Sequence, residues 1–276
     1  MQFLFVTDLH EKKKKYDNLF TYVTETKPDA VLIGGDLLPI KTEENDISSF
    51  IKKYIISPIK KIKNDVKFFI ILGNDDPRIY EELFIEADKK KILHYMHEKT
   101  LAFSDVFITG YAYIPPTPFQ LKDWERYDVS RFVDVGAISP EEGYFSFPLD
   151  MNKIKYGSIK KDLDDLVKNA PPNKTIFLFH SPPYDSFLDR AGLDGKMIDH
   201  TPLDVHIGSI AIKRFIEKYQ PFITLHGHVH ESSHLTGYWK QKFKETYSFS
   251  AAFTDEKLAV IKVDTNNPED ATRILL

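Results

Sequence analysis

"QFLFVTDLH", residues 2–10, is a run of apolar residues that ends in an aspartate and a histidine. Runs of four to six apolar residues closed by a polar turn are typical of buried strands. Asp8 and His10 lie two positions apart, so an extended backbone would point both side chains to the same side. The stretch therefore predicts a strand whose end presents two groups able to bind a metal.

Four further apolar runs lead into polar groups of the same kind. "AVLIGGD" ends in Asp36, "KFFIILGND" leads to Asn74, "TIFLFH" ends in His180, and "PFITLHGHVH" carries His228 and His230. Helix-like stretches lie between them, at residues 16–26, 46–63, 158–169 and 209–219. In the third stretch Ser158 is placed as an N-cap, with Ile159, Leu163 and Leu166 near one face.

Strands that alternate with helices predict an α/β protein. Ligands in such folds collect beyond the carboxyl ends of the strands, where these polar groups gather. The last runs, "TYSFSAAF" and "KLAVIKVD", are interpreted as strands paired with each other. The lysine runs "EKKKKY" and "DKKKI" are interpreted as solvated helix faces, with phosphate binding as the alternative.

Composition limits the function classes. The chain has 276 residues, 42% of them hydrophobic, which is enough for one large domain over residues 1–276. A net charge of −4 argues against nucleic acid as a partner, because a dedicated binder carries a basic excess. The absence of cysteine excludes disulfides and thiolate ligands. No signal peptide or membrane-spanning run is recognised, so we expect a soluble cytoplasmic protein, and its oligomeric state is not predicted.

Two segments interrupt the alternation. Residues 111–149 are rich in proline and aromatic residues, which predicts an inserted lid. Its aromatic side chains are expected either to stack on a base or aryl group or to fill the lid's own core: Tyr111, Tyr113, Phe119, Trp124 and Tyr127. Residues 181–208 form a turn-rich segment, and its His200 and His206 are candidates to reach a substrate because loops over a rigid sheet carry function.

The groups at the strand ends suit a metal centre. They comprise four imidazoles, two carboxylates and one amide, a set that favours Mn, Fe, Zn or Ni over Mg or Ca. Seven side chains are too many for one catalytic ion with an open position, so two divalent ions sharing a carboxylate are expected. Taken singly, Asp8, Asp36 and Asn74 could also be a turn former, a helix cap and a turn residue.

The ordered series D-x-H, G-G-D, G-N-x-D, a lone histidine after a strand, and G-H-x-H resembles the calcineurin-like metallophosphoesterase superfamily. The series runs from Asp8 to His230, and residues 206–232 also resemble small bacterial and archaeal members. The resemblance implies a β-sandwich flanked by helices. It also implies a phosphohydrolase that attacks a small organic phosphate or nucleotide with a hydroxide held between two metals.

The resemblance also assigns roles to residues. Asp8, His10 and His230 would hold one ion, Asn74, His180 and His228 the other, and Asp36 would bridge both. Relatives with G-N-H-D carry a histidine where Asp75 stands, and Asp76 would have oriented it. We expect Asp75, its pKa lowered by the cations, to act as a fixed negative charge that favours diesters over monoesters. The alternative is a cap for a helix starting near Pro77.

The remaining candidates have weaker arguments. Arg78 could meet a phosphate or form a surface salt bridge, and it joins Asp75, Asp76 and His206 as a catalytic candidate. His226 is interpreted as structural, and His94 and His97 as part of a solvated helix face. Two other functions stay open: a metal-binding scaffold without catalysis, and a nuclease.

Overall fold

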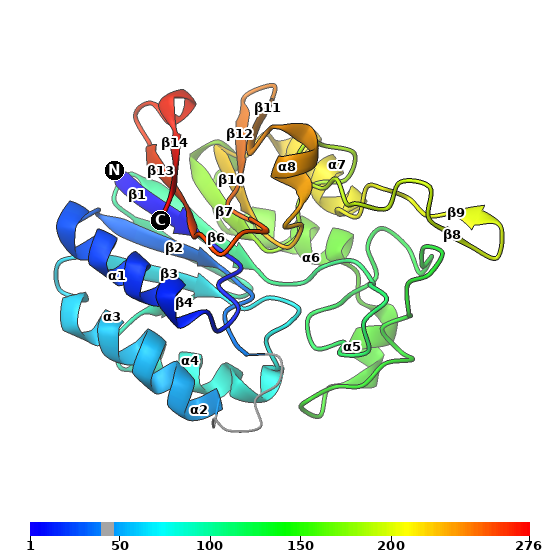
Figure 1. Ribbon diagram of the computed structural model, residues 1–276, viewed down its shortest axis with the longest axis horizontal. Coiled ribbons are helices and arrows are strands. Elements are labelled where there is room, and N and C mark those ends of the chain that lie inside the picture. The colour runs from blue at the N-terminus through cyan, green and yellow to red at the C-terminus, as the bar shows by residue number, and fades with distance from the viewer. Residues whose placement is uncertain (40–46) are drawn as a thin grey trace.

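The computed structural model describes residues 1–39 and 47–276. Two large sheets are stacked against each other with helices on their outer faces, which is the expected α/β sandwich (Figure 1). Within the described ranges each large sheet has six strands, and a two-stranded hairpin forms a third sheet. The predicted fold class is confirmed.

The first sheet has a parallel centre and an antiparallel edge. β1 pairs with β2, β2 with β3 and β3 with β4 in parallel, while β13 and β14 run antiparallel on the other side of β1. Its strands, in spatial order, are β14 (Thr272–Leu275), β13 (Ala259–Asp264), β1 (Gln2–Val6), β2 (Ala30–Gly34), β3 (Lys67–Ile71) and β4 (His94–Tyr95).

The second sheet also has a parallel centre. Parallel pairing joins β12, β10, β7 and β6, and an antiparallel strand closes each edge. Its strands, in spatial order, are β11 (Lys240–Phe243), β12 (Thr246–Ser250), β10 (Ile223–His226), β7 (Thr175–Phe179), β6 (Val106–Tyr111) and β5 (Lys99–Phe103).

The core lies between the sheets, where β2 contacts β7 and β3 contacts β6. One continuous cluster of buried apolar side chains runs through both sheets. The central strands β2, β7 and β10 are buried along their whole length. Strands that are covered on both faces have continuous apolar sequences, and for this reason these strands could be recognised in the sequence. The single-domain organisation stays a prediction.

Helices cover both outer faces. Figure 1 shows α1 to α4 beside the first sheet and α6 and α7 beside the second. The predicted N-cap Ser158 is confirmed, since its side chain accepts a hydrogen bond from the Lys161 N–H. Ser209 caps α7 in the same way and accepts from the Ile212 N–H. The helices are α1 (Lys13–Thr26), α2 (Ile47–Phe50), α3 (Ser57–Ile62), α4 (Glu81–Lys89), α5 (Met151–Tyr156), α6 (Ile159–Leu166), α7 (Ile210–Tyr219) and α8 (Ser232–Thr236).

The helix predicted over residues 46–63 is irregular. A π-helical segment, Ile51–Ile56, separates α2 from α3, and Pro58 lies at the start of α3. Proline has no N–H and its ring crowds the carbonyl four residues earlier, so regular α-helical bonding is interrupted there. The predicted start at Asp46 lies outside the described residues.

Two expectations about surface and pairing were wrong. β12 and β13 do not pair with each other, because β12 lies beside β10 and β11 in one sheet while β13 lies beside β1 and β14 in the other. In the run "EKKKKY", Lys15 is buried and donates a hydrogen bond from Nζ to the Asp8 carbonyl, 3.2 Å away. The lysines of "DKKKI" that the structure shows in ion pairs, Lys89 and Lys90, are exposed as expected.

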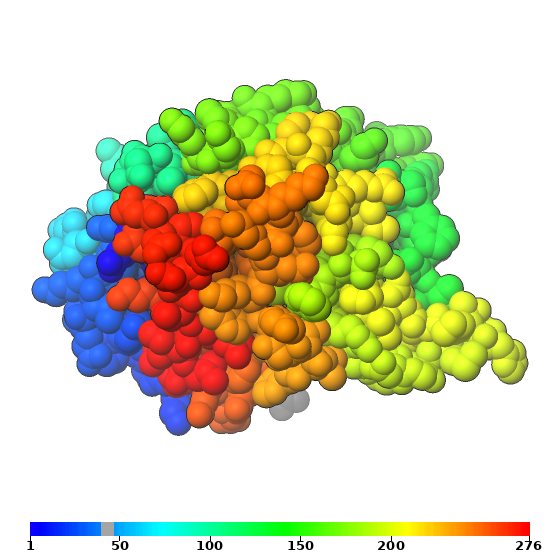
Figure 2. Space-filling view, turned by 90° about the horizontal axis from the view of Figure 1, so that it is seen from above, coloured from blue at the N-terminus to red at the C-terminus, as the bar shows by residue number. Residues whose placement is uncertain are grey.

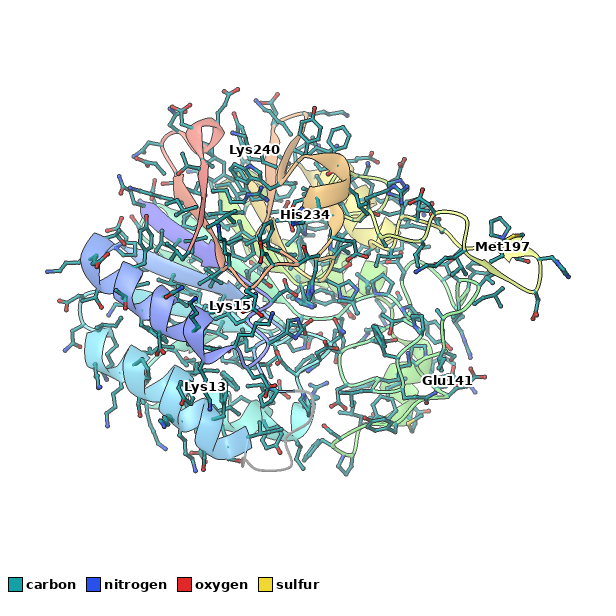
Figure 3. The ribbon with its side chains drawn as sticks, in the orientation of Figure 1. Lys13, Lys15, Glu141, Met197, His234 and Lys240 are labelled. Carbon is teal, nitrogen blue, oxygen red and sulfur yellow. The ribbon has the colours of Figure 1, made fainter. Side chains whose placement is uncertain are left out.

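The two irregular segments lie on one side of the molecule. Residues 112–150, called the lid below, run between β6 and α5 with isolated bridges but no named helix or strand in the described chain. Residues 181–208 contain the hairpin of β8 (Met197–Ile198) and β9 (Thr201–Pro202). This hairpin projects from the body of the molecule (Figure 2), and Met197 lies on it (Figure 3). Among the residues described, no helix has both the length and the apolar character needed to cross a bilayer.

Candidate metal centre

The turns after five central strands meet at one edge of the sandwich. β1, β2 and β3 are parallel neighbours in the first sheet, and β7 and β10 are parallel neighbours in the second. Their carboxyl ends therefore share an edge. Main-chain hydrogen bonds join the first two turns, since the Asp8 N–H donates to the Gly35 carbonyl and the His10 N–H donates to the Asp36 carbonyl.

The backbone of these turns is left-handed rather than extended. The φ angles are 56° at Asp8, 41° at His10, 52° at Asp36 and 72° at His228. The extended Asp8–His10 geometry predicted from the sequence is therefore wrong, because β1 ends at Val6 and the chain turns sharply afterwards. Such angles cost about 1–3 kcal/mol at a residue other than glycine and cluster at functional sites.

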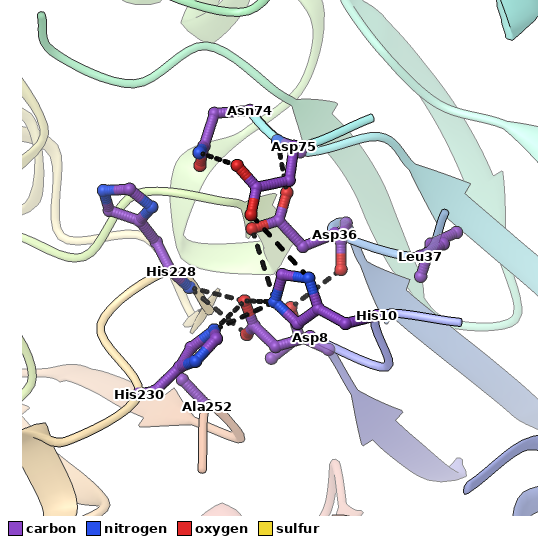
Figure 4. Close-up of polar contacts among 12 residues, drawn as sticks. Asp8, His10, Asp36, Leu37, Asn74, Asp75, His228, His230 and Ala252 are labelled. Atoms are coloured by element: carbon purple, nitrogen blue, oxygen red, sulfur yellow. Dashed lines mark hydrogen bonds and ion pairs between the residues drawn. The ribbon is translucent and has the colours of Figure 1, made fainter. Parts of the chain in front are cut away.

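One group of side chains comes from the turns after β1 and β10 (Figure 4). The Nε2 atoms of His10 and His230 lie 3.1 Å apart, and the His230 Nε2 lies 3.1 Å from Asp8 Oδ1. The His10 Nε2 is 3.9 Å from one oxygen each of Asp8 and Asp36. Ligand atoms of Asp8, His10, Asp36 and His230 all lie within 4.8 Å of one another.

A second group lies on the other side of Asp36. The His180 Nε2 is 3.1 Å from Asn74 Oδ1 and 3.2 Å from Asp36 Oδ2. Its Nδ1 lies 2.7 Å from the Gly34 carbonyl, which can only accept, so Nδ1 carries the proton. Ligand atoms of Asp36, His180 and His228 lie within 4.8 Å of one another. Asp36 is thus the member that both groups share.

The spacing and chemistry of these donors fit two divalent cations. Ions with bonds of about 2.0–2.2 Å to nitrogen and oxygen place neighbouring ligand atoms roughly 3 Å apart, as several pairs here are. The Nε2 atoms of His10 and His230 lie 3.1 Å apart, a separation that suits two ligands of one ion. The His and Asp groups therefore point to divalent metal binding, without identifying the metal.

Two glycines make this convergence possible. A Cβ at Gly73 would lie 2.2 Å from Asp36 Oδ1 and 2.7 Å from the His180 ring. A Cβ at Gly227 would lie 2.4 Å from the Thr7 hydroxyl and 2.8 Å from Asp8 Oδ2. Any side chain at either position would separate the turns that carry the proposed ligands.

Burial and crowding shift the pKa values at this edge. Burial lowers the pKa of His180, but the adjacent Asp36 carboxylate outweighs it and raises that pKa to about 10. Burial and the charge of Asp36 raise the pKa of Asp75 to about 7. The expected lowering of the Asp75 pKa is therefore contradicted, because burial and the charge of Asp36 outweigh the opposite effect of His180. The carboxylates together make a site that attracts positive charge.

Asp75 faces the proposed centre and caps no helix. Its Oδ1 accepts a hydrogen bond from the Asn74 amide at 2.9 Å, and its Oδ2 lies 3.7 Å from His10 Nδ1. The short helix that begins at Arg78 is held by other groups, because the Arg78 N–H donates to Asp123 and the Ile79 N–H donates to Ser146. The alternative that Asp75 is a helix cap is wrong. Its side chain is 27% exposed, so it can face a substrate.

Asp76 and Arg78 are held in structural contacts. Asp76 is completely buried, and its carboxylate accepts hydrogen bonds from the N–H groups of Leu37, Leu38 and Gly73. Arg78 donates from Nε to Glu81 and from Nη1 to the Tyr113 hydroxyl, and its guanidinium lies over the Trp124 ring. Arg78 does form a salt bridge, with Glu81, but the pair is largely buried rather than on the surface as expected. The catalytic role of Arg78 stays a prediction.

His206 belongs to an Asp–His pair that the sequence did not predict. Its Nδ1 lies 2.8 Å from Oδ1 of Asp189, a fully buried carboxylate. Asp189 also accepts hydrogen bonds from the N–H groups of Asp185, Ser186 and Gly208. The buried carboxylate thus fixes the ring and leaves Nε2, 3.7 Å from Asp185, at a partly exposed position.

The other histidines have separate environments. His226 is buried between the Ser181 carbonyl and the Thr224 hydroxyl, in agreement with its predicted structural role. The solvated helix face predicted for His94 and His97 is wrong, since His94 begins β4 and His97 is buried against Trp124. His200 is exposed at the turn of the projecting hairpin.

The lid aromatics fill the protein's own interior. Of the five predicted side chains Phe119 is exposed, and the other four are buried: Tyr111, which ends β6, and the lid residues Tyr113, Trp124 and Tyr127. Trp124 has no exposed surface and packs against Tyr113 and His97. Stacking of these four rings on a substrate is therefore contradicted, and the alternative of a lid core is correct.

Some contacts near the centre were missed from the sequence. The burial of Lys15 could have been inferred, because Lys15 lies four residues before Leu19 and therefore on the same, buried face of α1. Asp123 gave no such signal, because the N–H groups that it accepts from, those of Arg78 and Ser146, are distant along the chain. Asp189 accepts from the nearby Asp185 and Ser186, but its contact with His206 spans 17 positions and gave no local signal.

Comparison with known proteins gives the family. No protein with a curated description matches the chain by sequence. Among solved structures, TT1561 of Thermus thermophilus has a TM-score of 0.58 at 14% identity, with coverage of 99% of this chain and 98% of that one. A dimetal phosphatase from Danio rerio has a TM-score of 0.55 at 9% identity, with coverage of 95% and 91%. These similarities support the fold alone.

The sequence profile described as calcineurin-like phosphoesterase matches residues 1–232, which include all seven side chains gathered at the sandwich edge. The chain therefore belongs to the calcineurin-like phosphoesterase family.

Proposed function

We propose that this protein is a dinuclear-metal phosphodiesterase that acts on a small organic phosphate or nucleotide. The observation that carries the proposal is Asp36, a buried carboxylate shared by two groups of ligand-type atoms. Asp8, His10 and His230 would hold one ion, and Asn74, His180 and His228 the other. Two divalent cations held there supply a water of lowered pKa and neutralise the phosphoryl oxygens.

The preference for diesters is argued from Asp75. Its carboxylate lies 3.7 Å from His10 Nδ1 and is partly exposed, and its main-chain N–H donates a hydrogen bond to the Asp36 carboxylate. At roughly 6 Å and an effective dielectric near 20, one additional substrate charge costs about 2–3 kcal/mol. A monoester dianion carries roughly one charge more than a diester at neutral pH. Asp75 would therefore disfavour monoesters by about a hundredfold in rate.

His206 is proposed as the proton donor to the leaving group. Asp189 holds the ring at Nδ1, which directs Nε2 outward in the manner of a general acid. The test compares diesters of p-nitrophenol with diesters of alkyl alcohols in wild type and in His206→Gln. Loss confined to the alkyl esters, by about a hundredfold, is expected because poor leaving groups need a proton. An equal effect on both esters would reject the role.

The proposal as a whole is tested with purified protein and added Mn²⁺. We expect hydrolysis of bis(p-nitrophenyl) phosphate to exceed hydrolysis of p-nitrophenyl phosphate by about a hundredfold, with two ions bound per chain. Two bound ions without turnover of either ester would favour the scaffold function. Cleavage of DNA or RNA in preference to small diesters would favour a nuclease.

A further inference from the structure

The turn that carries Asn74 and Asp75 is fastened to its neighbours from two sides. On one side the Asp76 carboxylate reaches the turn after β2, where Oδ1 accepts from the N–H groups of Leu37 and Leu38 at 2.8 and 2.7 Å. Its Oδ2 accepts from the Gly73 N–H at 2.8 Å. Asp76 thus connects the turn containing Asn74 to the turn containing Asp36.

On the other side the lid holds the main chain of the same turn. The Trp124 Nε1–H donates to the Asp76 carbonyl at 2.7 Å, and the Trp124 ring is completely buried. Asp123 accepts from the Arg78 N–H at 2.7 Å and from the Ser146 N–H at 2.9 Å. Ser146 in turn accepts from the Ile79 N–H at 3.0 Å. Main-chain groups of residues 76–79 therefore have lid side chains as their partners.

The contacts between the lid and the Asn74–Asp75 turn match hydrogen-bond donors with acceptors. Residues 72–77 form neither helix nor strand, so no regular main-chain ladder fixes the position of Asn74. The lid supplies an indole N–H to a carbonyl and acceptor oxygens to two N–H groups, which satisfies donors and acceptors together. The bond from Trp124 to the Asp76 carbonyl is buried and the bond from Arg78 to Asp123 is partly buried, so these two main-chain groups depend on the lid for their partners, whereas the bond from Ile79 to Ser146 is exposed.

We infer that Asp123 and Trp124 are positioning residues for the second group of ligands, so that the lid acts on the reaction through the Asn74–Asp75 turn. This inference depends on the proposed function, because it assumes that Asn74 binds a metal. Metal ligands tolerate errors of only about 0.2 Å, and loss of a partner behind a ligand typically weakens metal binding about 10–100-fold. A loosened turn would thus weaken one of the two sites and leave the other intact.

The test uses Trp124→Phe, which keeps an aromatic ring in the lid core and removes the N–H donor. Trp239→Phe is the matched control, because Trp239 packs on Phe249 in the second sheet and the chain has two tryptophans. Metal-free proteins are titrated with Mn²⁺ by calorimetry. We expect Trp124→Phe to bind one Mn²⁺ about tenfold more weakly and the other as wild type does, while Trp239→Phe retains both affinities.

Two further measurements separate positioning from stability. Amide exchange of residues 73–79 in the metal-free protein should be faster in Trp124→Phe than in Trp239→Phe. Activity of Trp124→Phe should recover at saturating Mn²⁺ with an unchanged KM for the diester. Asp123→Asn provides an independent variant, with the same expected loss at one site.

The three outcomes are distinguishable. If Trp124→Phe and Asp123→Asn lower the melting temperature but bind both Mn²⁺ ions with wild-type affinity, the lid has only a structural role and the inference is wrong. If wild type itself binds no Mn²⁺, the proposed function fails and the inference fails with it. Weakening at one site alone, in both variants, supports the inference.

Discussion

The metal face, made of the turns after β1, β2, β3, β7 and β10, contrasts with the lid next to it. On the metal face, polar groups of the same kind lie close together; the Nε2 atoms of His10 and His230 are 3.1 Å apart. In the lid, charged groups are paired: Lys122 and Glu125 form a buried salt bridge, and Arg126 pairs with Asp162. Backbone strain also collects on the metal face, where four proposed ligands have positive φ angles.

The difference separates two kinds of buried polar group. Groups that satisfy one another stabilise a fold, whereas groups that crowd one another at a strained edge are held there by the rest of the structure. Substitutions on the metal face are therefore expected to remove metal and activity with little loss of stability. Substitutions in the lid are expected to lower stability and to leave substrate choice unchanged.

The largest effect is expected from Asp36→Asn. This change removes charge from both groups at once, so metal content and kcat should fall together, kcat by more than about a hundredfold. His10→Ala, which affects one group, should lose less metal. Elemental analysis and steady-state assays measure both quantities. Near-normal metal content in Asp36→Asn would show that Asp36 does not bridge.

The second effect concerns the stability of the lid. Trp124→Ala removes a fully buried ring and should lower the free energy of unfolding by about 3–5 kcal/mol, measured by urea denaturation. At saturating metal the relative rates on different diesters should not change. A stable Trp124→Ala protein with an altered substrate preference would restore the stacking interpretation that the structure contradicts.

Asp75 tests whether the metal face also selects the substrate. Asp75→Asn keeps the shape and removes the charge, so the ratio of monoester to diester hydrolysis should rise by up to about a hundredfold. Asp75→His should change the ratio in the same direction. Rates on both esters in parallel give the answer, and an unchanged ratio in both variants would remove Asp75 from substrate selection.

The smallest effect is expected from His97, beneath the lid. Burial lowers the pKa of His97 well below its usual value, and Arg78, Arg126 and Lys99 act in the same direction. The one carboxylate shown near its Nε2, that of Glu98, is 3.9 Å away. As the pH falls below about 6.5, His97 therefore binds a proton in the unfolded chain but stays neutral in the folded protein.

Because of His97, the unfolding free energy of wild type should fall as the pH is lowered from about 7 to about 5, by at most about 1.4 kcal/mol per pH unit. His97→Gln should show a shallower decline in unfolding free energy over that range. The comparison with wild type is needed because other buried histidines, such as His226, contribute in the same direction. Equal slopes in the two proteins would show that His97 is protonated in the folded state.

The two regions also differ in how far the sequence could predict them. The buried strands were predictable because both faces are covered and their sequences are continuous apolar runs. Ser158 and Ser209 were predictable as caps because capping is local. The convergence of the seven polar groups was predictable because the carboxyl ends of parallel strands share an edge. The left-handed turns that bring the groups together were not predictable.

The contacts inside the lid were harder to predict from the sequence. Its partners are distant in sequence, as in the bond from Trp124 to Asp76, and aromatic composition alone does not distinguish a core from a binding wall. The separation of β12 and β13 into different sheets was likewise hidden, because either apolar run could have paired locally. The pair of Asp189 with His206 was hidden for the same reason, since these two residues are 17 positions apart in the sequence.

The most direct test of the central claim is anomalous diffraction from crystals equilibrated with Mn²⁺. The account predicts two anomalous peaks, one among Asp8, His10 and His230 and one among Asn74, His180 and His228, with Asp36 touching both. A single peak, or two peaks without Asp36 between them, would contradict the claim that one shared carboxylate joins two metal sites at the edge of the sandwich.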